Sequence, residues 1–257
     1  MLLSRVEYAR PKTVAEALAL LGRDNARALA GGQSLLNVMK VRAAAPDLLV
    51  DLVDLEELRG ISRGPDGSLQ LGTMVTYAEA IASPEVSAAR PILAEVCSQI
   101  ADVQVRNRGT LGGNVCMSDP TNHLPPLLVA LGATFTVAAR EGSREVAADE
   151  FFLGVYFTAV GEGELLTAIT IPAKSGRDGF ASVTIGKEGT CIVSAAASVN
   201  GSTRIAIGCV SATPVVVDSP EAVGAAVGDA PADVHASAEY RRHLAEVLAR
   251  RSVEGAR

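Results

Sequence analysis

The sequence predicts an α+β fold in two domains, and three observations support that prediction. Amphipathic helical segments alternate with short apolar, strand-like runs over residues 1–176. Gly176-Arg177-Asp178-Gly179 then interrupts the pattern. Beyond this break, residues 177–257 contain three strand-like runs and one amphipathic helix. A chain of 257 residues buries enough surface for one large or two modest domains.

The N-terminal part begins with a helix whose start is well marked. Thr13-Val14-Ala15-Glu16 reads as a capping box, and apolar side chains then recur on one helical face up to Gly22. Thr76-Tyr77-Ala78-Glu79 opens a second capped helix. The other elements expected here are strands at 28–30, 48–53, 68–72 and 134–138 and helices at 90–100 and 124–131.

The C-terminal part is predicted to form a small α+β domain. Its strand-like runs cover 180–185, 192–199 and 204–210, and Asn200-Gly201 is a strong hairpin signal between the last two. We therefore expect a three-stranded antiparallel sheet. The tail, 232–251, is predicted to be an amphipathic helix with Tyr240, Leu244 and Val247 on one side.

Composition and charge argue against several classes of function. The net charge is −6 and basic residues do not cluster, which argues against a nucleic-acid surface. No apolar run reaches the length of a membrane span, and with Arg5 and Glu7 near the start we expect no secretory leader. The 4 cysteines lack C-x-x-C spacing, so we expect buried thiols in a reducing cytoplasm. No Ser-His-Asp set, carboxylate pair or metal-ligand cluster emerges, so the chemistry should come from a bound cofactor.

Two short glycine segments carry the functional signal. They are Ala30-Gly31-Gly32-Gln33-Ser34-Leu35-Leu36 and Gly109-Thr110-Leu111-Gly112-Gly113-Asn114. Adjacent glycines allow positive φ and let successive amides point into one concavity, which binds anions. Either segment alone would more often be an ordinary turn, but the two together suit a ligand with two linked phosphates. No G-x-G-x-x-G follows a strand, and Ala181 with Gly186-Lys187-Glu188 departs from the P-loop pattern, so Rossmann and Walker sites are excluded.

Longer motifs surround both glycine segments. A-G-G-Q-S-L-L at 30–36, R-N-R-G-T-L-G-G-N at 106–114, D-P-T-N-H-L-P-P at 119–126 and L-L-T-A-I-T-I-P at 165–172 occur in this order. With this ordered set the chain closely resembles the FAD-binding medium subunit of the molybdenum hydroxylases. That family includes carbon monoxide dehydrogenase, the xanthine dehydrogenases and bacterial enzymes that hydroxylate N-heterocycles. The resemblance covers the whole chain.

The resemblance implies both the architecture and the role of the chain. It implies a two-lobed FAD-binding domain of the vanillyl-alcohol-oxidase/PCMH type over 1–176, with a small lobe to about 57 and a larger lobe from about 58, and a C-terminal domain over 177–257. The family works as a heterotrimer, expected as a dimer of heterotrimers. A large subunit holds molybdopterin, a small subunit carries two 2Fe–2S clusters, and FAD in the medium subunit passes their electrons to an external acceptor.

The resemblance also implies which residues hold FAD. Gln33 stands where many relatives have a histidine, and because an amide cannot form the covalent flavin link we expect non-covalent FAD. The full set of expected FAD-binding residues is Ala30, Gly31, Gly32, Gln33, Ser34, Leu35, Thr76, Thr110, Leu111, Gly112, Gly113, Asn114, Asp119, His123, Leu165 and Lys187.

Several of these assignments have alternatives. Thr76 is explained equally well by helix capping, and Arg106 and Arg108 either balance phosphate charge or form surface ion pairs. His123 replaces the aspartate that relatives direct at the FAD ribose, with Asp119 as a substitute. Relatives place a lysine near the isoalloxazine shortly after the position of Phe180, where this chain has Ala181, so Lys187 is the nearest candidate.

Two other functions fit parts of the sequence. A stand-alone FAD oxidase of the same flavin fold would need its own substrate pocket, for which residues 177–257 leave little room. A non-catalytic partner with a decayed nucleotide site would not need intact glycine segments. A flavin bound to the purified protein would exclude the second alternative, and neighbouring genes for molybdenum and iron–sulfur subunits would argue against the first.

Overall fold

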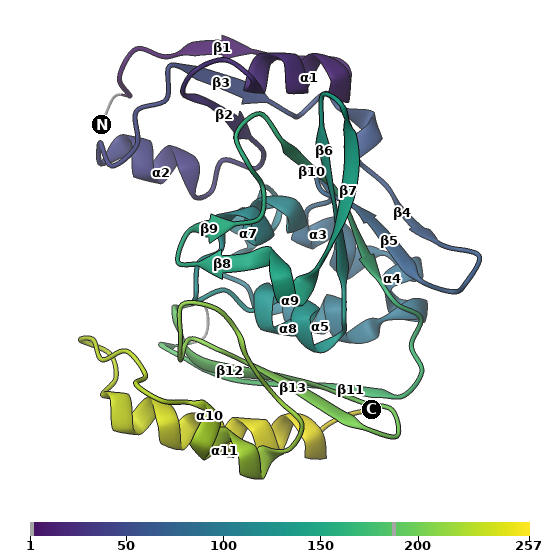
Figure 1. The fold of residues 1–257 in the computed structure, drawn as a ribbon, viewed down its shortest axis with the longest axis vertical. Helices are drawn as coiled ribbons and strands as arrows, with labels where there is room; N and C mark the ends of the chain where they lie inside the picture. Colours follow the sequence, from purple (N-terminus) through teal and green to yellow (C-terminus); the bar gives the residue numbers. More distant parts are fainter. Residues whose placement is uncertain (1–2, 187–188) are drawn as a thin grey trace.

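The computed structural model describes residues 3–186 and 189–257, which form three main sheets one above another (Figure 1). The N-terminal sheet is parallel, in the order β1-β3-β2. Its elements are β1 (Glu7–Ala9), α1 (Val14–Leu21), β2 (Ala26–Leu29), α2 (Leu35–Lys40) and β3 (Leu48–Asp51). The predicted cap of α1 is present, because the Thr13 side chain accepts a hydrogen bond from the Glu16 amide at 3.1 Å.

The central sheet is antiparallel, in the order β4-β5-β10-β6-β7. Its strands are β4 (Ile61–Arg63), β5 (Leu69–Gly72), β10 (Leu165–Ile171), β6 (Thr134–Ala139) and β7 (Gly142–Ala147). The connecting elements are η1 (Glu56–Leu58), α3 (Tyr77–Ala82), α4 (Pro84–Ala89), α5 (Pro91–Ser98), α6 (Val103–Arg106), α7 (Leu111–Met117), α8 (Leu124–Ala130), α9 (Ala148–Phe151), β8 (Phe152–Gly154) and β9 (Phe157–Thr158). Helices and sheet share one apolar core, in which the rings of Phe135 and Phe151 lie 4.3 Å apart.

The C-terminal sheet has four strands among the described residues, so the prediction of three was wrong. The three expected runs form β11 (Arg177–Thr184), β12 (Cys191–Val199) and β13 (Thr203–Gly208), and β14 (Val215–Val217) pairs with β13. The three residues of β14, which follow Pro214, form too short a pattern to indicate a strand in the sequence. Pairing with the exposed edge of β13 supplies the hydrogen bonds that β14 lacks alone. The remaining elements are η2 (Pro220–Ala222), α10 (Val223–Ala226) and α11 (Ala238–Glu254).

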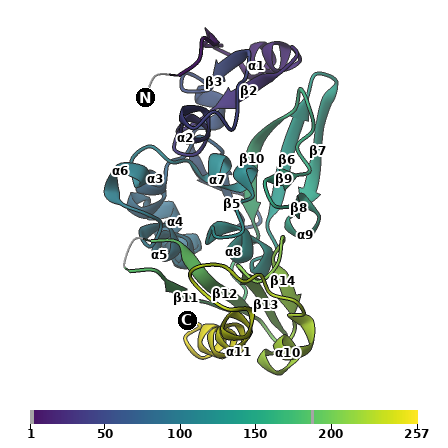
Figure 2. The same cartoon turned by 90° about the vertical axis from the view of Figure 1, so that its left-hand side faces the viewer.

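Helix α11 covers one face of the C-terminal sheet, while α8 and α5 lie on the other (Figures 1 and 2). The predicted apolar side of this helix was partly wrong, because Tyr240 is 46% exposed. The face that packs on the sheet consists of Arg241, Leu244, Ala245, Leu248, Ala249 and Ser252. Arg241 occupies a core position because its guanidinium donates to the carbonyl of Ile192 at 2.5 Å and to Asp233 at 2.6 Å.

A buried ion pair joins the C-terminal sheet to the central body. Arg90, just before α5, lies 2.5 Å from Asp178 on β11, and their side chains are 5% and 1% exposed. Arg90 also donates to the Pro172 carbonyl at 2.9 Å, and Asp178 accepts from Ser198. In the described ranges, no helix combines the length and apolarity needed to cross a membrane.

Candidate functional site

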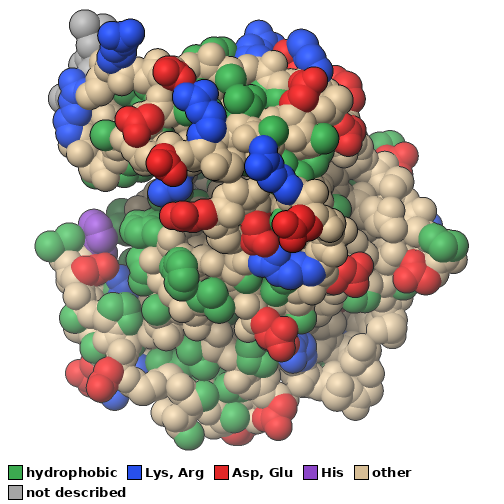
Figure 3. All heavy atoms as spheres, turned by 45° about the horizontal axis from the view of Figure 1, so that its top comes forward, with side chains coloured by type: hydrophobic (Ala, Val, Ile, Leu, Met, Phe, Trp, Pro, Cys, Tyr) green, Lys and Arg blue, Asp and Glu red, His purple; other side chains and the backbone are tan. Residues whose placement is uncertain are grey.

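A cavity of about 580 Å³ lies between the N-terminal sheet and the central body. The space-filling view shows the surface hollowed beneath the N-terminal elements (Figure 3). Both glycine segments form its walls, although about eighty residues separate them in the chain. The expected FAD-binding residues that line the cavity are Ala30, Gly31, Gly32, Gln33, Ser34, Leu35, Thr110, Gly112, Gly113, Asn114 and Leu165.

The first glycine segment leaves strand β2 and enters α2. A Cβ at Gly31 would lie 2.0 Å from the carbonyl oxygen of Arg108, so only glycine lets the two segments touch. Gly32 has a φ of 73°, which side chains rarely adopt. Within the described part of the chain, the backbone amides of Gly32, Gln33 and Ser34 donate no hydrogen bond, and the Ser34 side chain does not cap α2. Three consecutive amides at the cavity wall are therefore available to an anion.

The second glycine segment is the start of helix α7 rather than a second amide nest, so that expectation was wrong. Gly112 donates to the Thr73 carbonyl at 3.0 Å, and Gly113 donates to the Thr110 hydroxyl at 3.0 Å. Both glycines have negative φ, so the backbone conformation does not require glycine. Glycine is needed there because a side chain would lack space. A Cβ at Gly112 would lie 2.4 Å from the Cβ of Thr73, and Gly113 is exposed to the cavity.

Asn114 presents an unsatisfied group at the same wall. Its Nδ2 donates to the Tyr77 hydroxyl at 2.9 Å, whereas its buried Oδ1 has no partner among the described residues. Burial raises the pKa of Tyr77, which keeps the phenol neutral. An orphaned amide oxygen accepts a hydroxyl or N–H of a ligand. Free amides on one wall and this acceptor on the other fit FAD, which carries a diphosphate, hydroxyl groups and a ring N–H.

Four other expected residues do not line the cavity. Thr76 caps α3 with a full capping box, Leu111 is 1% exposed in the core, and Asp119 accepts hydrogen bonds from Thr121. His123 is 5% exposed, with its ring 5.3 Å from that of Phe180, so its predicted contact with the FAD ribose has no support here. Lys187 lies outside the described residues.

Other side chains at the cavity escaped the sequence analysis. Arg27, in the middle of β2, brings a cation to the wall that carries the free amides, and Asn122, Tyr156 and Glu164 complete other parts of the lining. Arg27 belongs to no sequence motif. Only its place in β2, directly before the first glycine segment, could have indicated that it lines the cavity. Arg106 instead donates to the carbonyls of Ile100 and Ala101, so it supports a turn.

Comparison with known proteins decides the family. Residues 4–174 match the family model described as the FAD binding domain in molybdopterin dehydrogenase. The chain belongs to this family. It is the FAD-binding medium subunit of a molybdenum hydroxylase, an oxidoreductase flavoprotein.

Two curated relatives of this medium subunit match nearly end to end. The carbon monoxide dehydrogenase medium chain of Afipia carboxidovorans is 37% identical, over 98% of this chain and 96% of the relative. The nicotine 6-hydroxylase medium subunit of Paenarthrobacter nicotinovorans is 34% identical, over 98% of both chains.

Solved structures agree with these relatives. A chain of carbon monoxide dehydrogenase from Hydrogenophaga pseudoflava is 35% identical and superposes with a TM-score of 0.93, covering 100% of this chain and 98% of that one. A chain of quinoline 2-oxidoreductase from Pseudomonas putida 86 is 32% identical, with a TM-score of 0.92, covering 99% of this chain and 98% of that one. The fold is therefore that of the carbon monoxide dehydrogenase flavin subunit.

Proposed function

We propose that this chain is the electron-transfer subunit of a heterotrimer, assembled as a dimer of heterotrimers with a large molybdopterin subunit and a small iron–sulfur subunit. Bound FAD supplies the electron relay between the partner's 2Fe–2S clusters and an external acceptor. Near end-to-end similarity to medium chains supports the subunit role. The observation that carries the proposal is the cavity in which both glycine segments meet.

Residues on both walls of the cavity bind FAD. The free amides of Gly32, Gln33 and Ser34 bind the diphosphate, with Arg27 as a nearby cation. Asn114 accepts a hydrogen bond from the cofactor, and Gly113 leaves room for it. Because Gln33 has no nucleophilic nitrogen, the cofactor is held without a covalent bond.

We also propose the division into a flavin domain of the PCMH type over 1–176, with lobes to about 57 and from about 58, and a C-terminal domain over 177–257. Three apolar clusters, centred on the N-terminal, central and C-terminal sheets, support this division. A cytoplasmic location is proposed on the grounds of the cysteine pattern alone.

Flavin content and activity of the purified chain test the proposal. We expect about one FAD per chain, released by acid or heat, and no oxidation of hydroxylase substrates until both partner subunits are added. Flavin that stays with the denatured polypeptide would contradict non-covalent binding. Turnover by the chain alone, free of partners, would instead support a stand-alone oxidase.

A further inference from the structure

Tyr156 is a large aromatic residue at the cavity that keeps most of its surface exposed. It lies in the turn between β8 and β9, which pair as a short antiparallel hairpin, and it is one of the residues that line the cavity. It is nevertheless 59% exposed. Within the described residues, its ring pairs with no other aromatic ring. A tyrosine that lines a cavity and is also largely exposed lies at the mouth of that cavity.

The backbone conformation of Tyr156 is unfavourable for a tyrosine. Its φ is 57°, in the left-handed region that glycine and asparagine adopt most readily. Hairpin turns that need such a conformation usually have one of these two residues there. The turn would therefore form more easily with glycine than with tyrosine. Backbone strain in a residue at a cavity indicates a function for its side chain.

The neighbouring helix holds Tyr156 in this conformation. The hairpin lies against α7 (Figure 1). The Tyr156 amide donates to the Ser118 carbonyl at 3.0 Å, and the Ser118 hydroxyl donates to the Gly154 carbonyl at 2.9 Å. Ser118 is itself left-handed, with a φ of 46°, and it ends α7, the helix that carries Gly113 and Asn114 at the cavity. The tyrosine is therefore fixed to the second wall of the cavity.

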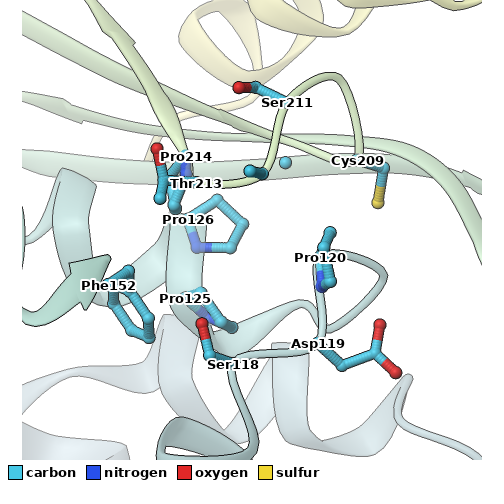
Figure 4. A pocket seen from close by; sticks show the side chains of 12 residues that line it. Ser118, Asp119, Pro120, Pro125, Pro126, Phe152, Cys209, Ser211, Thr213 and Pro214 are labelled. Atoms are coloured by element: carbon cyan, nitrogen blue, oxygen red, sulfur yellow. The ribbon is translucent and has the colours of Figure 1, made fainter. Parts of the chain in front are cut away.

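A second aromatic residue of the hairpin provides a comparison for Tyr156. Phe152 and Thr158 pair at the base of the hairpin and are buried. Figure 4 shows the Phe152 ring and Ser118, which lie where the hairpin joins the central body. Phe157, next to Tyr156 in the chain, is 61% exposed but is not among the residues that line the cavity. The two neighbours are alike in exposure and differ in their position relative to the cavity.

We propose that the Tyr156 ring stacks on the isoalloxazine ring of FAD and covers it at the mouth of the cavity. This inference rests on the proposed function, in which FAD fills the cavity and exchanges electrons with partners outside it. FAD has two ring systems, and the isoalloxazine is the one that carries the electrons. It therefore has to lie where a partner can reach it, and Tyr156 lies at that place.

The chemistry of Tyr156 suits this contact. Two aromatic rings attract each other in an offset or edge-to-face arrangement, in addition to the apolar surface that they bury. The pKa of Tyr156 is raised, first by the charge of Asp119 and then by burial, so the phenol is neutral at neutral pH. A neutral phenol places no negative charge beside a flavin that gains electrons.

Tyr156→Gly separates this role from a structural one. Glycine relieves the left-handed strain, which offsets its greater freedom in the unfolded chain, so we expect the urea midpoint of the apoprotein to stay the same or rise. FAD should bind at least about tenfold more weakly, because the stacked ring is lost. Tyr156→Phe keeps the ring and should bind FAD within about twofold of the wild type. Phe157→Ala, the matched control, should leave FAD affinity unchanged.

Two further measurements report which ring of FAD is covered. A tyrosine in contact with isoalloxazine quenches its fluorescence by donating an electron to the excited flavin, which phenylalanine does not do. Bound flavin should therefore be brighter in Tyr156→Phe than in the wild type, and Phe157→Ala should not change its emission. ADP, which has the adenine and the diphosphate but no isoalloxazine, should bind equally well to the wild type and to Tyr156→Gly.

Three results would overturn the proposal. Lower stability of Tyr156→Gly with unchanged FAD affinity would make Tyr156 a structural residue. ADP affinity that falls as much as FAD affinity in Tyr156→Gly would place the ring on the adenine. Equal emission of bound flavin in the wild type and Tyr156→Phe would reject the contact with isoalloxazine, even if the glycine variant did not fold. A wild-type chain that binds no FAD would instead contradict the proposed function itself.

Discussion

Gly31 and Gly32 are neighbours in the sequence, yet each is glycine for a different physical reason. Gly31 leaves space for the Arg108 carbonyl, which a Cβ would approach to 2.0 Å. Gly32 adopts a φ of 73°, and the nearest atom to a Cβ there belongs to the flexible Leu36 side chain. Substitution at Gly31 would separate the two walls of the cavity. Substitution at Gly32 strains one loop and narrows the amide nest.

Gly32→Ala should weaken FAD binding beyond its effect on stability. We expect the free energy of unfolding of the apoprotein to fall by about 1 kcal/mol, because alanine is strained at positive φ. FAD affinity should fall at least about tenfold, since the loop that carries the free amides shifts. Urea unfolding and flavin titration measure the two effects.

Gly201→Ala is the matched control. Gly201 has a φ of 85° in the turn between β12 and β13, and a Cβ there meets nothing within 4 Å. We expect a similar loss of stability with unchanged FAD affinity. Equal FAD affinities in Gly32→Ala and Gly201→Ala would show that the first glycine segment does not bind FAD.

At the scale of elements, two threonine caps position the second wall of the cavity. Thr76 caps α3 and Thr110 caps α7, and the two residues form an isolated β-bridge. The Tyr77 amide donates to the Gly109 carbonyl at 3.1 Å, so α3 begins directly on the second glycine segment. Thr110 lines the cavity, whereas Thr76 does not. Both helices therefore border the site, α7 with Gly112, Gly113 and Asn114 and α3 with Tyr77.

Removing the two caps should separate stability from cofactor binding. Thr76→Ala and Thr110→Ala should each lower the free energy of unfolding by about 1 kcal/mol, the usual loss for an N-cap. FAD affinity should stay within about twofold in Thr76→Ala and fall several-fold in Thr110→Ala, because the Gly113 amide loses its acceptor at the cavity wall. Thr110→Ser, which keeps the hydroxyl, should restore FAD affinity. Weaker FAD binding in Thr76→Ala than in Thr110→Ala would reverse these assignments.

At the scale of the whole molecule, the Arg90–Asp178 pair holds the C-terminal sheet on the central body. Both side chains are almost fully buried, and Arg90 also donates to the carbonyls of Pro172 and Ala173. These carbonyls belong to the segment that leads from β10 to β11. The guanidinium therefore fixes the connection as well as the strand.

Arg90→Met should destabilise the protein strongly, because it leaves the Asp178 carboxylate buried without its cation. We expect a loss of about 3–5 kcal/mol in the free energy of unfolding. Arg23→Ala, which breaks an exposed pair with Glu7 (side chains 52% and 66% exposed), should cost less than about 1 kcal/mol. Urea unfolding of both variants measures the difference. Similar losses in the two variants would show that the buried pair does not hold the sheets together.

Local patterns predicted much of the secondary structure. The helix starts at Thr13 and Thr76, the hairpin at Asn200-Gly201 and the strand at 134–138 were confirmed, because caps, turns and alternation depend on nearby residues. Strand β14 was missed and the buried face of α11 was misplaced. Strand β14 depends on pairing with β13, and the buried face of α11 depends on the hydrogen bonds that Arg241 makes to Ile192 and Asp233.

The sequence by itself determined the family, the cofactor and the residues of both glycine segments, because short motifs preserve the local backbone that a diphosphate site needs. Only the tertiary structure decided how those segments act. Gly32 lies in a loop of free amides, while Gly112 is glycine because Thr73 packs against it. The tertiary structure also placed Arg27 at the cavity and the His123 ring beside that of Phe180. These contacts join residues far apart in the chain, and no local pattern encodes a distance in space.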